Sequence, residues 1–70
     1  MAQIISPIAG KLVEINIKVG QALTADDEAF VVEAMKMENE IVSPQDGVVA
    51  SINVTACQSV EAGALLATLN

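Results

Sequence analysis

The chain has 70 residues, of which 53% are apolar, and its three lysines and nine acids give a formal net charge of -6. This length predicts one small domain, residues 1–70, because so short a chain buries only ~60% of its unfolded surface on folding. The apolar fraction excludes a disordered tail, and the acidic balance argues against binding to nucleic acid or to an anionic membrane surface.

Apolar and polar side chains alternate with a period of two in residues 12–19 and again in residues 48–55. β-Branched residues are frequent, and Ser-Pro, Gly and Asp-Gly interrupt the pattern at short intervals. Strands this short, joined by turns, favour an all-β flattened barrel or sandwich. In chain order, the pattern predicts about eight strands, at roughly 3–6, 11–17, 21–24, 29–34, 37–42, 47–54, 58–61 and 65–69.

A helix is the alternative for residues 25–41, since Ala, Glu, Met and Lys are strong helix formers and the stretch 24–27, Thr-Ala-Asp-Asp, is able to cap a helix. Phe-Val-Val at 30–32 and the extended exit Ile-Val-Ser-Pro at 41–44 argue against it. We therefore predict two strands in this region.

The sequence repeats itself with an offset of 37 positions: Ser6-Pro7 matches Ser43-Pro44, and Gly10 matches Gly47. Two copies are too few for a solenoid. The repeat therefore predicts two half-domains related by a pseudo-twofold axis, each completing the core of the other.

The predicted strands 29–34 and 37–42 form a hairpin with a two-residue loop, Met35-Lys36. Such loops favour Asn-Gly or Gly, and each non-glycine residue at positive φ costs on the order of 1 kcal/mol. Met35-Lys36 breaks this turn preference, although the strands on both sides fit their predicted pattern. Such a local exception at the end of a hairpin points to function. The predicted cross-strand pairs are Ala34 with Met37, Glu33 with Glu38, Val32 with Asn39, and Phe30 with Ile41.

Lys36 has no counterpart in the repeat, because an offset of 37 in either direction falls outside the chain. The pseudo-twofold mate of the tip is therefore the region where the chain begins and ends. We predict that Lys36 and the two termini lie at opposite poles, with the lysine presented outward.

The inventory of reactive groups is narrow, since the chain has no His, Trp or Tyr and a single cysteine, Cys57. These absences predict no His-based catalysis, no catalytic residues and no zinc or other metal site. One thiol forms no internal disulfide, and we expect Cys57 to be a small buried residue in a reducing compartment. Any chemistry therefore depends on an attached group or on a partner.

The first residues, Met1-Ala2-Gln3, lack a charged leader followed by a long apolar stretch, so we expect no signal peptide. No apolar run is long enough to span a bilayer, so no direct membrane insertion is expected. The expected location is the cytoplasm, or an organelle matrix in a eukaryote.

The tip sequence resembles the attachment motif of biotinyl domains, the carboxyl carriers of biotin-dependent carboxylases, decarboxylases and transcarboxylases. The Ala-Met-Lys-Met core of this motif is specific, and the resemblance extends over nearly the whole chain. The matching segments are Pro7-x-x-Gly10, Glu33-Ala34-Met35-Lys36-Met37-Glu38, Ser43-Pro44-x-Asp46-Gly47 and Val60-x-x-Gly63.

The resemblance implies a flattened barrel of two four-stranded antiparallel sheets, without the thumb of some acetyl-CoA carboxylase carriers. It implies biotin covalently attached to Lys36 by a biotin protein ligase, and a non-catalytic carrier, as in acyl-CoA carboxylases. The lysine arm then shuttles carboxybiotin between biotin carboxylase and carboxyltransferase sites at a high effective concentration. The residues implied in ligase and partner recognition are Glu33, Ala34, Met35, Met37 and Glu38.

Two positions depart from the family pattern. The turn glycine expected at position 57 is Cys57, although its repeat mate Gly20 is present, and the Gly-Asp pair expected after Leu23 is Asp26-Asp27. Both departures lie far from the tip in sequence, so they bear on turn geometry rather than on attachment.

Two other functions fit the same fold. One is a lipoyl carrier of a 2-oxo acid dehydrogenase complex, in which the lysine usually follows Asp and precedes Ala. The other is an unmodified lipoyl-like interaction module, as in efflux adaptors. Methionine on both sides argues against the first, and the intact Lys36 argues against the second.

Overall fold

A computed structural model describes residues 2–70, which form eight strands and no helix. Each predicted strand is present, with ends that differ from the prediction by at most two residues. The helical alternative for residues 25–41 is excluded, because this region contains two paired strands. The strands are β1 (Ala2–Ile5), β2 (Gly10–Ile15), β3 (Ala22–Leu23), β4 (Glu28–Ala34), β5 (Met37–Val42), β6 (Gly47–Ile52), β7 (Ser59–Val60) and β8 (Leu65–Leu69).

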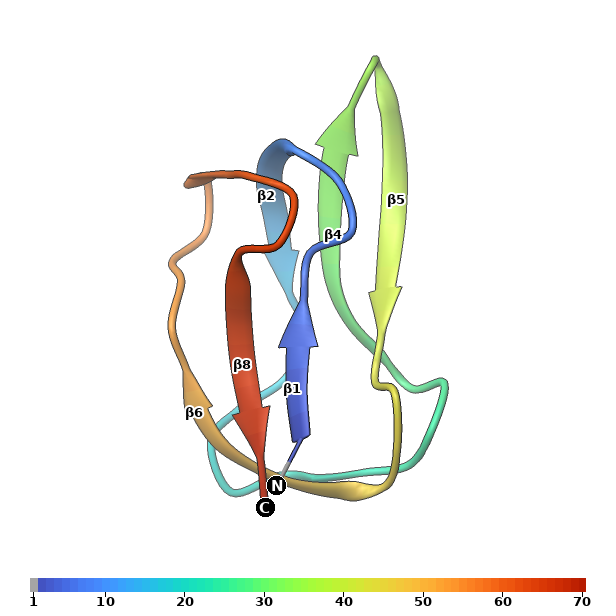
Figure 1. The fold of residues 1–70 in the computed structure, drawn as a ribbon, viewed down its shortest axis with the longest axis vertical. Helices are drawn as coiled ribbons and strands as arrows, with labels where there is room; N and C mark the ends of the chain where they lie inside the picture. The colour runs from blue at the N-terminus through green and yellow to red at the C-terminus, as the bar shows by residue number, and fades with distance from the viewer. Residues whose placement is uncertain (1) are drawn as a thin grey trace.

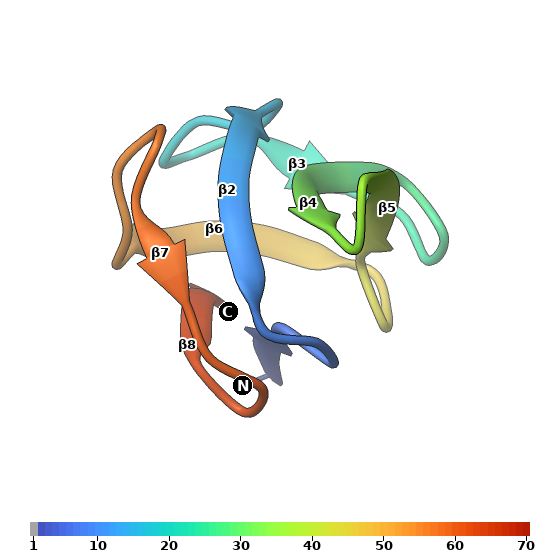
Figure 2. The same cartoon turned by 90° about the horizontal axis from the view of Figure 1, so that it is seen from above.

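The strands form two four-stranded sheets, with the orders β1-β8-β6-β3 and β5-β4-β2-β7. All the pairings are antiparallel, and the sheets enclose one core between them (Figures 1 and 2). The predicted all-β fold class is thereby confirmed.

The two halves of the chain repeat each other in hydrogen bonding as well as in sequence. Ser6 and Ser43 are both fully buried. Each hydroxyl donates to the carbonyl oxygen two residues further on, Ile8 in one half and Gln45 in the other, at 2.7 Å in both. Because a buried hydroxyl needs a partner, this bond holds the same turn in each half. The predicted pseudo-twofold relation is confirmed.

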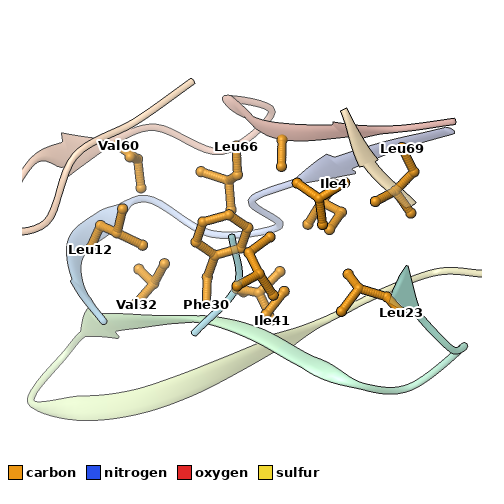
Figure 3. Packing of buried hydrophobic residues seen from close by; sticks show 13 residues of the cluster. Ile4, Leu12, Leu23, Phe30, Val32, Ile41, Val60, Leu66 and Leu69 are labelled. Atoms are coloured by element: carbon orange, nitrogen blue, oxygen red, sulfur yellow. The ribbon is translucent and has the colours of Figure 1, made fainter. Parts of the chain in front are cut away.

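The core is filled by side chains from both sheets, with Phe30 and Leu66 pointing toward one another near its centre (Figure 3). In β4 the pair Ala29-Phe30 is small then large, and its repeat mate in β8, Leu66-Ala67, is large then small. All four residues are fully buried. This exchange of volumes lets two similar halves fill one interior at close packing.

The two departures from the family pattern lie at turns with positive φ. Cys57 has φ 68° where its mate Gly20 has φ 91°, and Asp26 has φ 73° where its mate Gly63 has φ 89°. The turns therefore keep their left-handed geometry with non-glycine residues. The expectation that Cys57 is buried is wrong: its side chain is exposed, because the turn between β6 and β7 directs it to solvent.

Candidate functional site: the lysine hairpin

The site is the end of the β4–β5 hairpin, residues 33–38, which we call the lysine hairpin. The observed cross-strand pairs include all four that were predicted, from Phe30 with Ile41 to Ala34 with Met37. Met35 and Lys36 have φ of 53° and 64°, so both central residues of the turn are left-handed, as a type I′ hairpin turn requires. The twist of this turn matches that of the strands, and Lys36 lies at the apex.

The side chains at the apex are open to solvent. Met35 is 85% exposed and Met37 is 66% exposed, and Lys36 is exposed between them. No pocket is found within residues 2–70, so no cavity of the described chain holds the lysine or a group attached to it. A primary amine on a long flexible stem is free here to enter the active site of another protein.

The hairpin and the chain ends lie at opposite poles of the molecule (Figure 1). The apex of β4–β5 is at the top of this view, and the labels N and C are at the bottom. The predicted placement is confirmed, because the pseudo-twofold relation pairs β5 with β1 and β4 with β8. The lysine therefore lies at the end of the domain away from the N and C labels (Figure 1).

The charged residues of the hairpin lie in one cross-strand row. Glu33 pairs with Glu38 on β5 and with Lys11 on β2, and all three side chains are exposed. Two acids directly opposite each other repel mildly, and the lysine on the other side partly compensates. The row forms an exposed flank below Lys36, and its role in recognition stays a prediction.

Ala34 differs from the other residues of the motif, because only 9% of it is exposed. Its Cβ lies against Gly10 at the start of β2, where an added Cβ would be 3.1 Å away. Packing against Gly10 therefore explains why the side chain at position 34 is small. The sequence pattern contained Pro7-x-x-Gly10 but gave no sign of this contact, because Gly10 and Ala34 are far apart in the chain.

Asn39 is a second residue that was not singled out as part of the site. Its side-chain amide donates to the carbonyl oxygens of Val32 at 3.3 Å and of Met37 at 3.4 Å. The half-buried amide thus bridges both strands of the hairpin just below the turn. The predicted pairing of Val32 with Asn39 was the signal that placed it there.

Neither a metal centre nor a membrane span is found among residues 2–70. No group of three or more His, Cys, Asp or Glu side chains is arranged to hold a metal ion there, Asp26, Asp27 and Glu28 included. The same residues contain no helix long and apolar enough to cross a bilayer. The geometry is that of a small β domain with an exposed lysine at the apex of a hairpin turn.

Comparisons with known proteins agree with this class. The family described as "Biotin-requiring enzyme" matches residues 2–69. The biotin carboxyl carrier protein of Streptococcus mutans serotype c is 38% identical over 64 residues, covering 91% of this chain and 49% of that protein. The mitochondrial propionyl-CoA carboxylase alpha chain of Homo sapiens is also 38% identical over 64 residues, covering 91% of this chain and 9% of that protein.

Solved structures show the same likeness. The urea carboxylase of Kluyveromyces lactis superposes with a TM-score of 0.90 at 29% identity, over 97% of this chain and 6% of that chain. The chain belongs to the family of biotin-requiring enzymes, as its resemblance to biotinyl domains implied. At the level of the family, the expected carrier function and the expected cofactor, biotin, are both confirmed. The chain spans about half the length of the Streptococcus relative and under a tenth of the human one.

Proposed function

We propose that residues 1–70 form a biotin carboxyl carrier domain and that biotin is attached through Lys36. The observation that carries the proposal is the position of this lysine: an exposed amine at the apex of a two-residue turn, at the pole opposite the chain ends. The biotin ring supplies a nitrogen that accepts and releases a carboxyl group. The chain supplies the mobile arm and the rigid hairpin from which the arm extends.

Attachment uses the Lys36 amine as a nucleophile. The neutral Nζ attacks the acyl carbon of biotinyl-AMP, the C–N amide bond forms, and the C–O bond to AMP breaks. A base of the ligase takes the amine proton, since the neighbouring carboxylates of Glu33 and Glu38 are exposed to solvent and, being negative, favour the protonated amine. The positive charge of Lys36 is lost, so the net charge of -6 becomes one unit more negative.

Once attached, the arm works by effective concentration. A tethered group reaches a second site without diffusing through bulk solution, which raises its local concentration to about the millimolar range for a short flexible link. The arm would swing between a biotin carboxylase site and a carboxyltransferase site, each on another domain or subunit. This chain is then non-catalytic, and its partners are those two activities and a biotin protein ligase.

The proposed compartment is the cytoplasm or an organelle matrix. Cys57 is exposed on a turn, and a thiol in this setting stays reduced only where the surroundings are reducing.

The test is co-expression of the chain with a biotin protein ligase, followed by intact mass measurement and streptavidin blotting. We expect one biotin increment, lost in Lys36→Arg and kept in Lys11→Arg and Lys18→Arg, because these two lysines are also exposed but lie outside the hairpin turn. A lipoyl increment would indicate the lipoyl carrier instead. An unmodified chain would indicate an interaction module.

A further inference from the structure

The start of β2 lies unusually close to the lysine hairpin. A Cβ added to Gly10 would be 2.3 Å from the carbonyl oxygen of Glu33, 2.8 Å from Cγ1 of Val32 and 3.1 Å from Cβ of Ala34. A carbon atom does not fit 2.3 Å from a backbone oxygen, and this oxygen moves only if β4 moves with it. Any side chain at position 10 therefore requires β4 to shift.

The atoms that Gly10 touches belong to the residues just before the turn. Glu33 and Ala34 are the last two residues of β4, and the next two residues are Met35 and Lys36. Ala34 is buried, whereas the turn beyond it is exposed. We call the contact between Gly10 and residues 33–34 the hairpin seat, because it is where the body of the domain supports the protruding turn.

The pseudo-twofold relation provides an internal comparison. Gly47 is the repeat mate of Gly10, is equally half-buried, and also starts a strand. A Cβ added to Gly47 would be 2.9 Å from the carbonyl oxygen of Asn70 and 3.2 Å from Cβ of Leu69. The same close approach therefore occurs at both poles, but only the one at Gly10 supports the lysine.

We propose that Gly10 is a positioning residue for Lys36, which sets the height and direction of the lysine hairpin through the hairpin seat. The inference rests on the proposed attachment of biotin to Lys36. A methyl group at position 10 pushes residues 33–34 away from β2 and carries the turn with them. Because a misplacement of about 1 Å costs up to ~100-fold in rate, the amine no longer meets the acyl carbon in the ligase site at the correct angle.

The experiment measures kcat and KM for biotinylation of the 70-residue chain by a biotin protein ligase, in wild type, Gly10→Ala and Gly47→Ala. We expect kcat/KM to fall about tenfold in Gly10→Ala, mainly through kcat, and to stay within about twofold of wild type in Gly47→Ala. Acylation of Lys36 by a small succinimidyl ester is expected to be unchanged in both variants, because it requires exposure of the amine but no alignment. Amide NMR shifts are expected at residues 33–38 in the first variant and at residues 69–70 in the second.

Equal ligation rates in the two variants, whether normal or reduced, would overturn the inference. The rate would then not depend on whether the glycine lies against the lysine hairpin, as Gly10 does, or against the C-terminal residues, as Gly47 does. If Gly10→Ala does not fold, Ala34→Val tests the same seat from the β4 side. A slow Ala34→Val with shifted hairpin amides supports the inference, and a rate like that of wild type overturns it. A wild-type chain that takes up no biotin contradicts the proposed function instead, so the two failures are distinct.

Discussion

The two central residues of the turn in the lysine hairpin adopt the left-handed backbone conformation, which residues with a Cβ disfavour. Met35 and Lys36 have φ of 53° and 64°, and neither is glycine or asparagine. Each such residue costs about 1–2 kcal/mol relative to a right-handed conformation. The lysine cannot be exchanged without losing the amine, but the cost at Met35 is removable.

We expect Met35→Asn to raise the free energy of unfolding by about 0.5–1 kcal/mol, because asparagine tolerates the left-handed region. In a domain of this size the gain corresponds to a rise in Tm of roughly 2–8 °C. The matched control is Met37→Asn, since Met37 is also exposed but lies in β5 at negative φ, where asparagine is a poor strand residue. An equal gain in both variants would show that removal of an exposed methionine, rather than turn geometry, is responsible.

The turn at Cys57 gives a second prediction from the same physics. Its repeat mate is Gly20, and an added Cβ at Gly20 would meet nothing within 4 Å, so only backbone conformation distinguishes the residues. We expect Cys57→Gly to stabilise the domain by up to about 1 kcal/mol and Gly20→Ala to destabilise it by about 1 kcal/mol, as measured by urea unfolding. Cys57→Ala keeps the strain and is expected to change little. A gain in Cys57→Ala equal to that in Cys57→Gly would count against this account.

At the scale of the element, three features stabilise the lysine hairpin: the β4–β5 strand pairing, the hairpin seat at Gly10 and the hydrogen bonds of the Asn39 amide. One cross-strand pair destabilises it. Glu33 and Glu38 are directly opposite and exposed. Like charges in such a pair destabilise a hairpin by a few tenths of a kcal/mol up to about 1 kcal/mol. The pair lies directly below the turn that carries Lys36, and we propose that it takes part in recognition by partner proteins.

We expect Glu38→Gln to stabilise the domain by about 0.5 kcal/mol at low ionic strength, because it removes this repulsion. The gain shrinks in 1 M NaCl, where the Debye length falls to about 3 Å. Glu61→Gln makes the same change in net charge at an exposed position outside the strands and is the control. Urea unfolding at both salt concentrations separates the two, and equal effects would assign the gain to net charge.

At the scale of the whole molecule, stability depends on one interior shared by two similar halves. Phe30 is the single aromatic residue of the chain and is fully buried between the sheets, in the same cluster as Leu66 (Figure 3). A domain of 70 residues has a total stability of roughly 4–10 kcal/mol, so the filling of this centre accounts for a large share.

We expect Phe30→Ala to cost about 3–5 kcal/mol, through lost burial and the cavity left between the sheets. Circular dichroism would then show a chain largely unfolded at 37 °C, or a Tm lowered by more than 10 °C. Val19→Ala, at a residue that is 63% exposed, is expected to stay within about 0.5 kcal/mol of wild type. A Phe30→Ala variant with normal stability would show that the two halves do not depend on the filling of this centre.

Much of the fold was predictable because its information is local. Period-two alternation located the strands, Ser-Pro and Gly marked the turns, and the 37-residue offset implied the pseudo-twofold relation. The hairpin register followed from the two-residue loop alone, since a loop of that length determines which residues pair. The position of Lys36 at the pole opposite the chain ends followed from the repeat. The position equivalent to Lys36 in the other half falls just outside the chain, so the pseudo-twofold axis places the chain ends at the opposite pole.

Other features depended on contacts between distant segments, which no local pattern reports. Cys57 is typical of a buried residue by type, but its turn places it in solvent. Gly10 and Ala34 are 24 positions apart in the chain, and their contact exists only once β2 lies beside β4. The sequence by itself determined the strands, the turn and the position of the lysine to which we assign biotin attachment. The tertiary structure decided how that lysine is supported, because only packing brings the glycine of one strand against the backbone of another.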